Sequence, residues 1–261
     1  MTLLYIGTDT SAKLSGSTLI LPAANNIGNI GQLAIDLIVS TYGLKRVGFL
    51  ESPWVLPLAG NDAYAKPGDQ AGVLHTSFEV YQDADSLLTV VQLRSLVIKT
   101  KIDLFAKDLQ DWIEQSEFKQ VVQLTGCDAR RRLDPQIQSV PVRFAWANQP
   151  TKIFENEVAA YGWKALEPVD PSALDGAVNH AIPPGAGSTR YLLEHFGSST
   201  VPIIAVIWFA SEGDNIPDAV NLAGFADTLL HGPKDTPIQW KPPHSWNLLF
   251  GGRLFTRELF Q

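Results

Sequence analysis

Strand-like and helix-like segments alternate along almost the whole chain. Short apolar runs that predict strands lie at 17–22, 47–50, 74–81, 87–93, 121–124, 142–146 and 201–209. Apolar residues at helical spacing predict helices at 29–42, 104–116, 153–161, 187–196 and 216–230. This alternation is typical of an α/β fold with helices on both faces of one sheet. A polar turn at 82–86 joins two of the strands as a hairpin, so we expect a mixed sheet rather than a purely parallel one.

Two of the expected helices carry signals at their ends. The first has apolar residues at helical spacing after Ile30, and Gly43 stands where a helix would end. The last opens with Asn215 as an N-cap, Pro217 in the first turn and a carboxylate at Asp218. We therefore expect both helices to be well defined.

Composition narrows the class of protein. The chain has 261 residues, of which 45% are apolar and 18% charged, a balance typical of a globular protein with a real core. Its net charge is −7, and Arg130-Arg131-Arg132 is the one basic run, so no nucleic-acid footprint is predicted. No secretory signal or stretch long enough to span a bilayer is recognisable.

The single cysteine, Cys127, fits a reducing compartment and follows an apolar run, which favours a buried structural thiol. We expect a cytoplasmic protein that could also enter the nucleus.

One serine has the sequence context of a hydrolase nucleophile. Ser211 follows an expected strand and precedes an expected helix, as the nucleophile of a hydrolase elbow does. That elbow needs glycine two residues before the serine, because its sharp turn leaves no room for a side chain there. The residue at that position is Phe209, so an ordinary turn serine is the favoured interpretation.

Two glycine-rich segments could bind phosphate at the start of a helix. The segment from Gly185 to Arg190 lacks the lysine and the glycine spacing of a P-loop. The segment from Gly28 to Gly31 falls short of a dinucleotide fingerprint. The five histidines lack the spacing of helical metal ligands, and helix capping accounts for most of the acidic cluster at 212–218. We therefore predict no catalytic residue, no cofactor and no metal.

The C-terminal region combines aromatic residues with a free carboxylate. Trp240, Trp246, Phe250 and Phe255 precede the last three residues, Leu259, Phe260 and Gln261. A terminal carboxylate beside an aromatic anchor is a known docking mode, although late apolar residues also often pack on their own domain. We predict an α/β domain at 1–238 and an aromatic segment with an extended docking tail at 239–261. The partner-binding residues predicted are Leu259, Phe260, Gln261, Phe255, Phe250 and Trp246.

Several strings of the sequence, taken together, resemble one family. They are 21–23 (LPA), 28–38 (GNIGQLAIDLI), 91–95 (VQLRS), 211–219 (SEGDNIPDA) and 245–251 (SWNLLFG). In this order and spacing they resemble the proteasome assembly chaperone 2 family, over nearly the whole chain. None of the strings is a catalytic fingerprint, but the joint match is specific.

The resemblance implies a chaperone rather than an enzyme. Family members pair with proteasome assembly chaperone 1, and the heterodimer sits on the outer face of the proteasome α-ring. There it promotes correct assembly and prevents off-pathway ring dimers. The implied fold is an α/β sandwich similar to nucleoside phosphorylases. Some relatives end in a hydrophobic residue, a tyrosine and any final residue, and dock that end between α-subunits; here Phe260 replaces the tyrosine.

Two alternatives to a chaperone stay open at this point. One is a nucleoside phosphorylase-like or hydrolase-like enzyme that uses Ser211 or the segment from Gly185 to Arg190. The other is a general α/β scaffold protein with different partners. The incomplete catalytic sets and the C-terminal anchor favour the chaperone.

Overall fold

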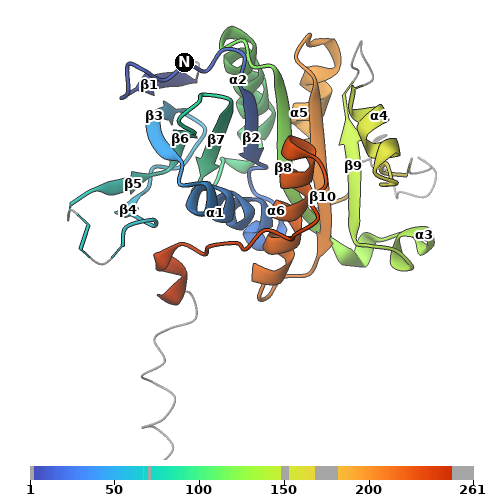
Figure 1. Cartoon of the computed structure of the whole chain (residues 1–261). Coiled ribbons are helices and arrows are strands. Elements are labelled where there is room, and N and C mark those ends of the chain that lie inside the picture. The colour runs from blue at the N-terminus through green and yellow to red at the C-terminus, as the bar shows by residue number, and fades with distance from the viewer. Residues whose placement is uncertain (1–2, 67, 70–71, 148–152, 168–181, 249–261) are drawn as a thin grey trace, which may run out of the picture.

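Eight strands form one mixed sheet in the computed structural model, which describes residues 3–66, 68–69, 72–147, 153–167 and 182–248 (Figure 1). In their order across the sheet these strands are β1 (Leu4–Gly7), β3 (Lys45–Glu51), β6 (Phe78–Gln82), β7 (Leu88–Leu93), β2 (Thr18–Pro22), β8 (Gln120–Asp128), β10 (Ile203–Ala210) and β9 (Val142–Trp146). Strands β4 (Ala59–Asn61) and β5 (Leu74–Thr76) form a separate two-stranded sheet. The helices are α1 (Ile30–Tyr42), α2 (Ile102–Gln115), α3 (Asp134–Ile137), α4 (Ile153–Ala160), α5 (Thr189–His195) and α6 (Ile216–His231).

The middle of the sheet is parallel and both sides are antiparallel. Strand β2 runs parallel to β7 and to β8, and β8 runs parallel to β10. The outer pairs β1–β3, β3–β6, β6–β7 and β9–β10 are antiparallel, which confirms the mixed sheet expected from the sequence. Because the four central strands point the same way, the loops that follow them meet at one edge of the sheet.

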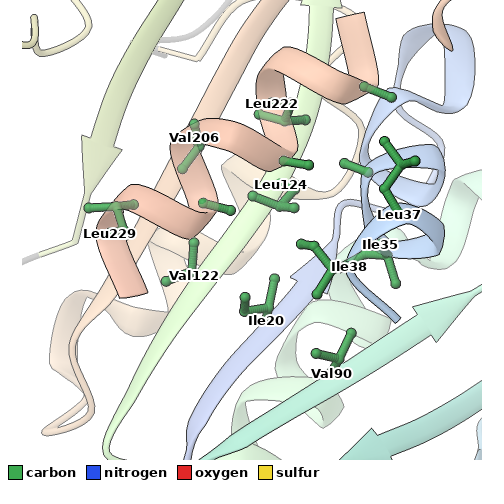
Figure 2. Packing of buried hydrophobic residues seen from close by; sticks show 14 of the residues in the cluster. Ile20, Ile35, Leu37, Ile38, Val90, Val122, Leu124, Val206, Leu222 and Leu229 are labelled. Carbon is green, nitrogen blue, oxygen red and sulfur yellow. The ribbon is translucent and has the colours of Figure 1, made fainter. Parts of the chain in front are cut away.

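Helices cover both faces of the sheet. Helices α1 and α6 lie side by side on one face, over Ile20, Val122 and Val206 (Figure 2). Helices α2 and α5 pack on the other face, where Leu19 and Val121 point. Neighbouring residues of a strand alternate between the two faces, so a strand buried on both faces is expected to be almost entirely apolar, as β2 and β10 are. No helix in the described ranges is long and apolar enough to cross a membrane.

The expected elements are present, with three differences. The expected strand at 74–81 is wrong as one element, because it divides at Ser77: β5 pairs with β4, whereas β6 pairs with β3 and β7. Helix α5 begins at Thr189 rather than residue 187, since Gly187 has a positive φ of 57° that a helix cannot contain. Strands β1 and β4 and the short helix α3 had no counterpart among the expected elements.

The two helix ends were predicted correctly in position. Gly43 ends α1 in the left-handed conformation, with φ of 65°. Asn215 stands at the N-cap of α6, but its side chain does not accept a helix N–H. Its amide instead donates to Ser211 O and to Asp218 Oδ2, both at 2.8 Å, and Asp214 Oδ1 accepts the N–H of Ile216 at 3.2 Å.

The chain after α6 returns across the domain to α1. Lys241 N donates to Thr41 Oγ1 at 3.0 Å, and a short 3-10 helix, η6 (His244–Leu248), follows. Trp240 is half-buried, with its ring centroid 6.3 Å from that of Tyr42. Trp246 is 9% exposed and packs on its own domain, and its predicted role in partner binding stays a prediction.

The rest of the predicted tail lies outside the described residues. It comprises Phe250, Phe255, Leu259, Phe260 and Gln261. Their partner-binding role, the division at residue 238 and the likeness to nucleoside phosphorylases all stay predictions.

Candidate functional site

The segment around Ser211 does not form a nucleophile elbow. Strand β10 ends at Ala210 and α6 begins only at Ile216, so no sharp strand-to-helix turn presents the serine. Within the described part of the chain, no side chain forms a hydrogen bond with the Ser211 hydroxyl, and its carbonyl accepts the Asn215 amide. Phe209 is a buried strand residue. The geometry therefore favours a turn serine.

The segment from Gly185 to Arg190 is used for packing. A Cβ on Gly187 would lie 1.8 Å from the carbonyl oxygen of Ala24, so this glycine lets two loops touch. Ser188 N donates to Ala24 O at 2.9 Å, and Ser188 Oγ accepts the N–H of Ala24 at 2.9 Å. Arg190 points away from this contact and pairs with Glu194 at 3.0 Å. The Ser188 N–H, one of the donors that a phosphate would need, is thus bonded to the neighbouring loop.

Gly28 and Gly31, which follow β2, also allow close packing between segments of the chain. Gly28 has φ of 61°, and a Cβ there would lie 2.3 Å from Asn215 Oδ1. A Cβ on Gly31 would lie 2.4 Å from the carbonyl oxygen of Leu124, so this glycine brings α1 close to β8. Asn26 Oδ1 accepts the N–H groups of Gly31 and Gly126, both at 3.3 Å. The family-like strings at 28–38 and 211–219 thus meet through close packing.

A shallow hollow of about 310 Å³ lies at this edge of the sheet. Ile27, Asp128, Arg130, Ser211 and Glu212 line it. Asp128 and Arg130 form an exposed ion pair at 2.7 Å, and hydrogen bonds from Arg130 lower the pKa of Asp128 to about 2. These paired charges provide neither a general base poised near neutral pH nor a nucleophile.

Cysteine and metal chemistry find no support in the described part of the chain. Cys127 is fully buried, and burial followed by the nearby charge of Asp128 raises the pKa of its thiol, which keeps it protonated. This matches the structural thiol expected from the sequence. No group of three or more histidine, cysteine, aspartate or glutamate side chains that could hold a metal occurs among the residues described.

Two substitutions test the enzyme interpretation directly. We expect Ser211→Ala and Arg190→Ala to leave the function of the protein in cells intact, with only small losses of stability. Both side chains lie at the surface and neither joins a catalytic set. The check is complementation of a knockout, with thermal unfolding of the purified variants. Loss of function by a variant that stays folded and still binds its partners would favour the enzyme.

A buried carboxylate joins four separate segments of the chain. Asp36 of α1 is 3% exposed, and its Oδ1 accepts hydrogen bonds from Tyr64 Oη, Gln92 Nε2 and Arg94 Nη2, each at 2.7 Å. The indole Nε1 of Trp246 approaches Asp36 Oδ2 at 3.4 Å. We call this set of five side chains the Asp36 network.

Two members of the Asp36 network, Arg94 and Tyr64, have raised pKa values. Burial alone would lower the pKa of Arg94, but the Asp36 carboxylate outweighs it and raises that pKa above its ordinary value. Burial, and then the Asp36 charge, raise the pKa of Tyr64, so its phenol stays protonated and donates. Gln92 and Arg94 belong to the string at 91–95, Asp36 to 28–38 and Trp246 to 245–251. Three of the family-like strings therefore meet here.

A second polar cluster adjoins the Asp36 network and holds the small sheet against the main one. His75 of β5 is 3% exposed and lies between two carboxylates, with Nδ1 against Glu79 Oε2 and Nε2 2.7 Å from Asp62 Oδ1. Glu79 is fully buried and also accepts hydrogen bonds from Tyr81 Oη at 2.8 Å and Arg46 Nη1 at 2.7 Å. The rings of Tyr64 and His75 touch edge to face, which links the two clusters.

The Glu79 carboxylate should make the protein sensitive to acid. Burial favours its neutral form, but hydrogen bonds from His75, Tyr81 and the Thr76 N–H outweigh burial and lower its pKa below the ordinary 4.5. Its contribution to stability is therefore present above pH 4.5 and is lost as the pH falls through the lowered value. We expect the free energy of unfolding to fall less steeply below pH 4.5 in Glu79→Gln. Urea denaturation of both proteins at several pH values in that range measures this. An equal decrease of the free energy of unfolding with pH in the two proteins would contradict it.

An apolar surface lies at the free edge of the main sheet. Strand β1 is the last strand on its side, and Leu4 and Ile6 line a hollow of about 650 Å³ together with Phe49, Val55 and Pro57. Leu56 and Leu58, next in sequence to the lining residues Val55 and Pro57, are also exposed, as is Leu96. Leu56 N donates to Leu96 O at 2.9 Å, so these two lie side by side. Exposed apolar surface beside an unpaired strand edge is typical of a protein–protein contact.

The sequence contained a signal for the Asp36 network that we did not use. Asp36 stands in the middle of the apolar stretch Ala34 to Ile38 of an expected helix, where a charge must be paired if it is buried. Arg94 follows an apolar strand in the same way. The partner assignment itself needs the fold, because the five side chains come from distant positions.

The family model named PAC2 family matches residues 20–224 of this chain. A Danio rerio protein named Proteasome assembly chaperone 2 is 38% identical over 248 residues, which cover 93% of this chain and 95% of that relative. The Homo sapiens protein of the same name is 32% identical over 255 residues, which cover 94% of this chain and 96% of that relative.

Solved structures of similar fold are more distant in sequence. Pyrococcus furiosus PbaA, described as an archaeal homolog of proteasome-assembly chaperone, has a TM-score of 0.63 at 12% identity, covering 89% of this chain and 88% of its own. Pyrococcus furiosus PbaB, described as an archaeal proteasome activator, has a TM-score of 0.59 at 16% identity, and the match covers 90% of this chain and 91% of PbaB. At this identity they establish the fold alone, whereas the family model and the curated relatives carry the assignment. The chain belongs to the PAC2 family.

Proposed function

We propose that this chain is a proteasome assembly chaperone that acts as a heterodimer with proteasome assembly chaperone 1 on the α-ring of the core particle. There it promotes correct assembly and prevents off-pathway ring dimers, in the cytoplasm and also in the nucleus. The observation that carries the proposal is the match over more than nine tenths of its length to relatives named Proteasome assembly chaperone 2. The match extends over nearly the full length of those relatives, so a common role for the whole domain is the simplest explanation.

The surfaces of the domain support action through protein contacts. The apolar residues at the free edge of the main sheet offer a face that a second subunit could cover. In the glycine-rich loops that a phosphate-binding enzyme would use, Ala24 occupies the space beside Gly187 and Asn215 the space beside Gly28. The enzyme alternative is therefore not favoured.

We propose that Leu259, Phe260 and Gln261 dock the chain in a pocket of the α-ring, with Phe250 and Phe255 as further contacts. A buried aromatic residue at the centre of such a pocket commonly contributes about 2 kcal/mol or more, and a terminal carboxylate adds a charge-assisted bond where a lysine lies at the pocket mouth. The missing tyrosine hydroxyl would cost one hydrogen bond, or about 0.5–1.5 kcal/mol. Docking by Phe260 is then weaker than docking by tyrosine but not lost.

Changes at the last three residues test this directly. We expect deletion of Leu259, Phe260 and Gln261, or extension of the chain past Gln261 by a few residues, to weaken binding to purified α-rings about tenfold or more. The extension is the sharper change, because it keeps the ring and removes only the carboxylate at that position. Binding is measured by titration with the partner chaperone present.

Two controls make the tail experiment specific. The same added residues at the N-terminus should leave the affinity unchanged, and Phe260→Tyr should preserve or tighten binding. Equal affinity for the unaltered, deleted and extended chains would mean that the tail is a bystander and that the body of the heterodimer does the docking.

A further inference from the structure

Strand β1 has a hydrogen-bonded neighbour on one side only. It is the last strand of the main sheet and, among the described residues, it pairs with β3 alone (Figure 1). Its antiparallel register with β3 runs from Leu4 to Gly7, and one residue further Thr8 N donates to Val47 O at 2.9 Å. Bonded residues alternate along an antiparallel pair, so Thr8, Ile6 and Leu4 point their N–H and C=O groups toward β3.

The residues between them leave their backbone groups at the open edge of the sheet. Tyr5 and Gly7 alternate with the bonded residues, so their N–H and C=O groups point away from β3. The strand is held in this position by its tyrosine. Tyr5 Oη donates to Val47 O at 3.3 Å, and its ring covers Gly48, where a Cβ would lie 2.5 Å from Tyr5 Cε2. A strand with two donors and two acceptors facing outward is a template for a further strand.

The side chains of β1 place this open edge beside the apolar hollow of about 650 Å³. Leu4 and Ile6 are 55% and 39% exposed, and both line the hollow. A strand added antiparallel to Tyr5 and Gly7 would have a residue opposite Ile6 in a non-hydrogen-bonded pair, in which the side chains of neighbouring strands come closest. That side chain would lie on the same face as Ile6 and enter the hollow. One extended segment would therefore satisfy the open backbone groups and fill the hollow together.

One carboxylate indicates the chemistry of the added strand. Glu51 is the only charged residue among those that line the hollow, it stands opposite Leu4, and it forms no ion pair with any described residue. A lysine or arginine on the added strand would complement it. A second copy of this chain would not supply that charge through its own β1, because the strand has no basic residue and Asp9 follows it. Two copies would also both carry the net charge of −7.

We propose that an edge strand of proteasome assembly chaperone 1 pairs antiparallel with β1, so that the main sheet continues into the second subunit. The added strand has apolar side chains at alternate positions, one of which fills the hollow beside Ile6, and a lysine or arginine that reaches Glu51. This inference rests on the proposed function, because it names the surface through which the heterodimer forms. The bonds to Tyr5 and Gly7 fix the register of the two subunits, and the apolar contacts supply specificity.

Gly7→Pro tests the strand pairing itself. Proline has no N–H, so the change removes one outward donor while the bonds of Ile6 and Thr8 to β3 stay. We expect Gly7→Pro to weaken binding of the full chain to purified proteasome assembly chaperone 1 about tenfold or more, measured by titration calorimetry. Gly7→Ala keeps the N–H, and its Cβ would lie 3.4 Å from the Tyr5 ring, so it should bind as the unaltered chain does. Equal affinity of the proline and alanine variants would overturn the inference.

The apolar contacts are tested at the two exposed side chains of β1. We expect the double variant Leu4→Ser and Ile6→Ser to weaken binding about tenfold or more, and it serves where Gly7→Pro does not fold. Leu87 is the matched control, because it is 68% exposed in the turn between β6 and β7 and does not line the hollow. Leu87→Ser should change the affinity less than twofold. A loss of the same size in Leu87→Ser, or no loss in the double variant, would contradict docking at this edge.

The charge of Glu51 tests the chemistry of the added strand. Glu51→Lys should weaken binding at low salt about threefold or more, and Glu51→Gln should weaken it less. Added salt should narrow the difference between the two variants. Equal affinity of Glu51→Lys and the unaltered chain at low salt would overturn the basic residue proposed for the partner strand.

Amide hydrogen exchange shows which groups of β1 the second subunit covers. In the free chain the amides of Tyr5 and Gly7 should exchange faster than those of Ile6 and Thr8, and in the heterodimer all four should be protected. Fast exchange of Tyr5 and Gly7 in a heterodimer that does form would overturn the strand pairing and leave the proposed function standing. Protection of the same amides by self-association of this chain alone would overturn the choice of partner. If the unaltered chain does not bind proteasome assembly chaperone 1, the proposed function fails and this inference fails with it.

Discussion

Replacing Arg94 with leucine is expected to lower the free energy of unfolding by roughly 3–5 kcal/mol, the range measured when one partner of a buried ion pair is removed. The buried Asp36 carboxyl would then have lost its ion-pair partner and keep only the neutral donors Tyr64, Gln92 and Trp246. Urea denaturation of the purified chain, followed by circular dichroism, measures the change.

An exposed pair in the same protein is the matched control. Arg130 pairs with Asp128 at the same 2.7 Å, but its side chain is 83% exposed, so Arg130→Leu should change stability little or not at all. Similar small effects of Arg94→Leu and Arg130→Leu would show that the Asp36 network does not hold the fold together.

Gly187→Ala is expected to destabilise the fold by roughly 2–5 kcal/mol, through left-handed backbone strain and overpacking together. Gly187 has φ of 57°, and its new Cβ would lie 1.8 Å from the carbonyl oxygen of Ala24, a backbone atom that cannot rotate away. The loops after β2 and before α5 would have to separate. Thermal and urea unfolding measure the loss.

A glycine with free space around it provides the comparison. Gly224 lies inside α6, and a Cβ there meets nothing within 4 Å. Gly224→Ala should therefore leave stability unchanged or raise it by up to about 1 kcal/mol, because alanine favours helix. A Gly187→Ala variant as stable as Gly224→Ala would contradict the close packing of the glycine-rich loops.

Much of the fold could be predicted because the strands and helices differ in period. The apolar stretch of β10 and the helical spacing of α1 identify buried elements without any knowledge of their neighbours. The local sequence pattern could not show which strands pair with each other. The segment 74–81 alternates as one strand would, yet residues before and after Ser77 pair with different strands. Strand β1 is mostly exposed and therefore has no alternating apolar pattern that would predict it.

The candidate site was predicted less completely than the fold. The glycines from Gly28 to Gly31 and from Gly185 to Gly187 resemble phosphate loops because both uses need a backbone without a Cβ, and only the structure shows which atom fills the space. Trp246 looked like a surface aromatic because the sequence could not show that Asp36 lies beneath it. The family resemblance drew on the same residues, since three of its strings contribute to the Asp36 network.

Purification of the tagged full-length chain from its own cells, followed by quantitative mass spectrometry, tests the proposed function most directly. The tag belongs at the N-terminus, because one at the C-terminus would block the carboxylate of Gln261. We expect proteasome α-subunits and a second, paralogous chaperone to be recovered in near-stoichiometric amounts, with the α-subunits reduced when Leu259, Phe260 and Gln261 are deleted. Recovery of the folded chain without α-subunits or a paralogous chaperone would contradict the account.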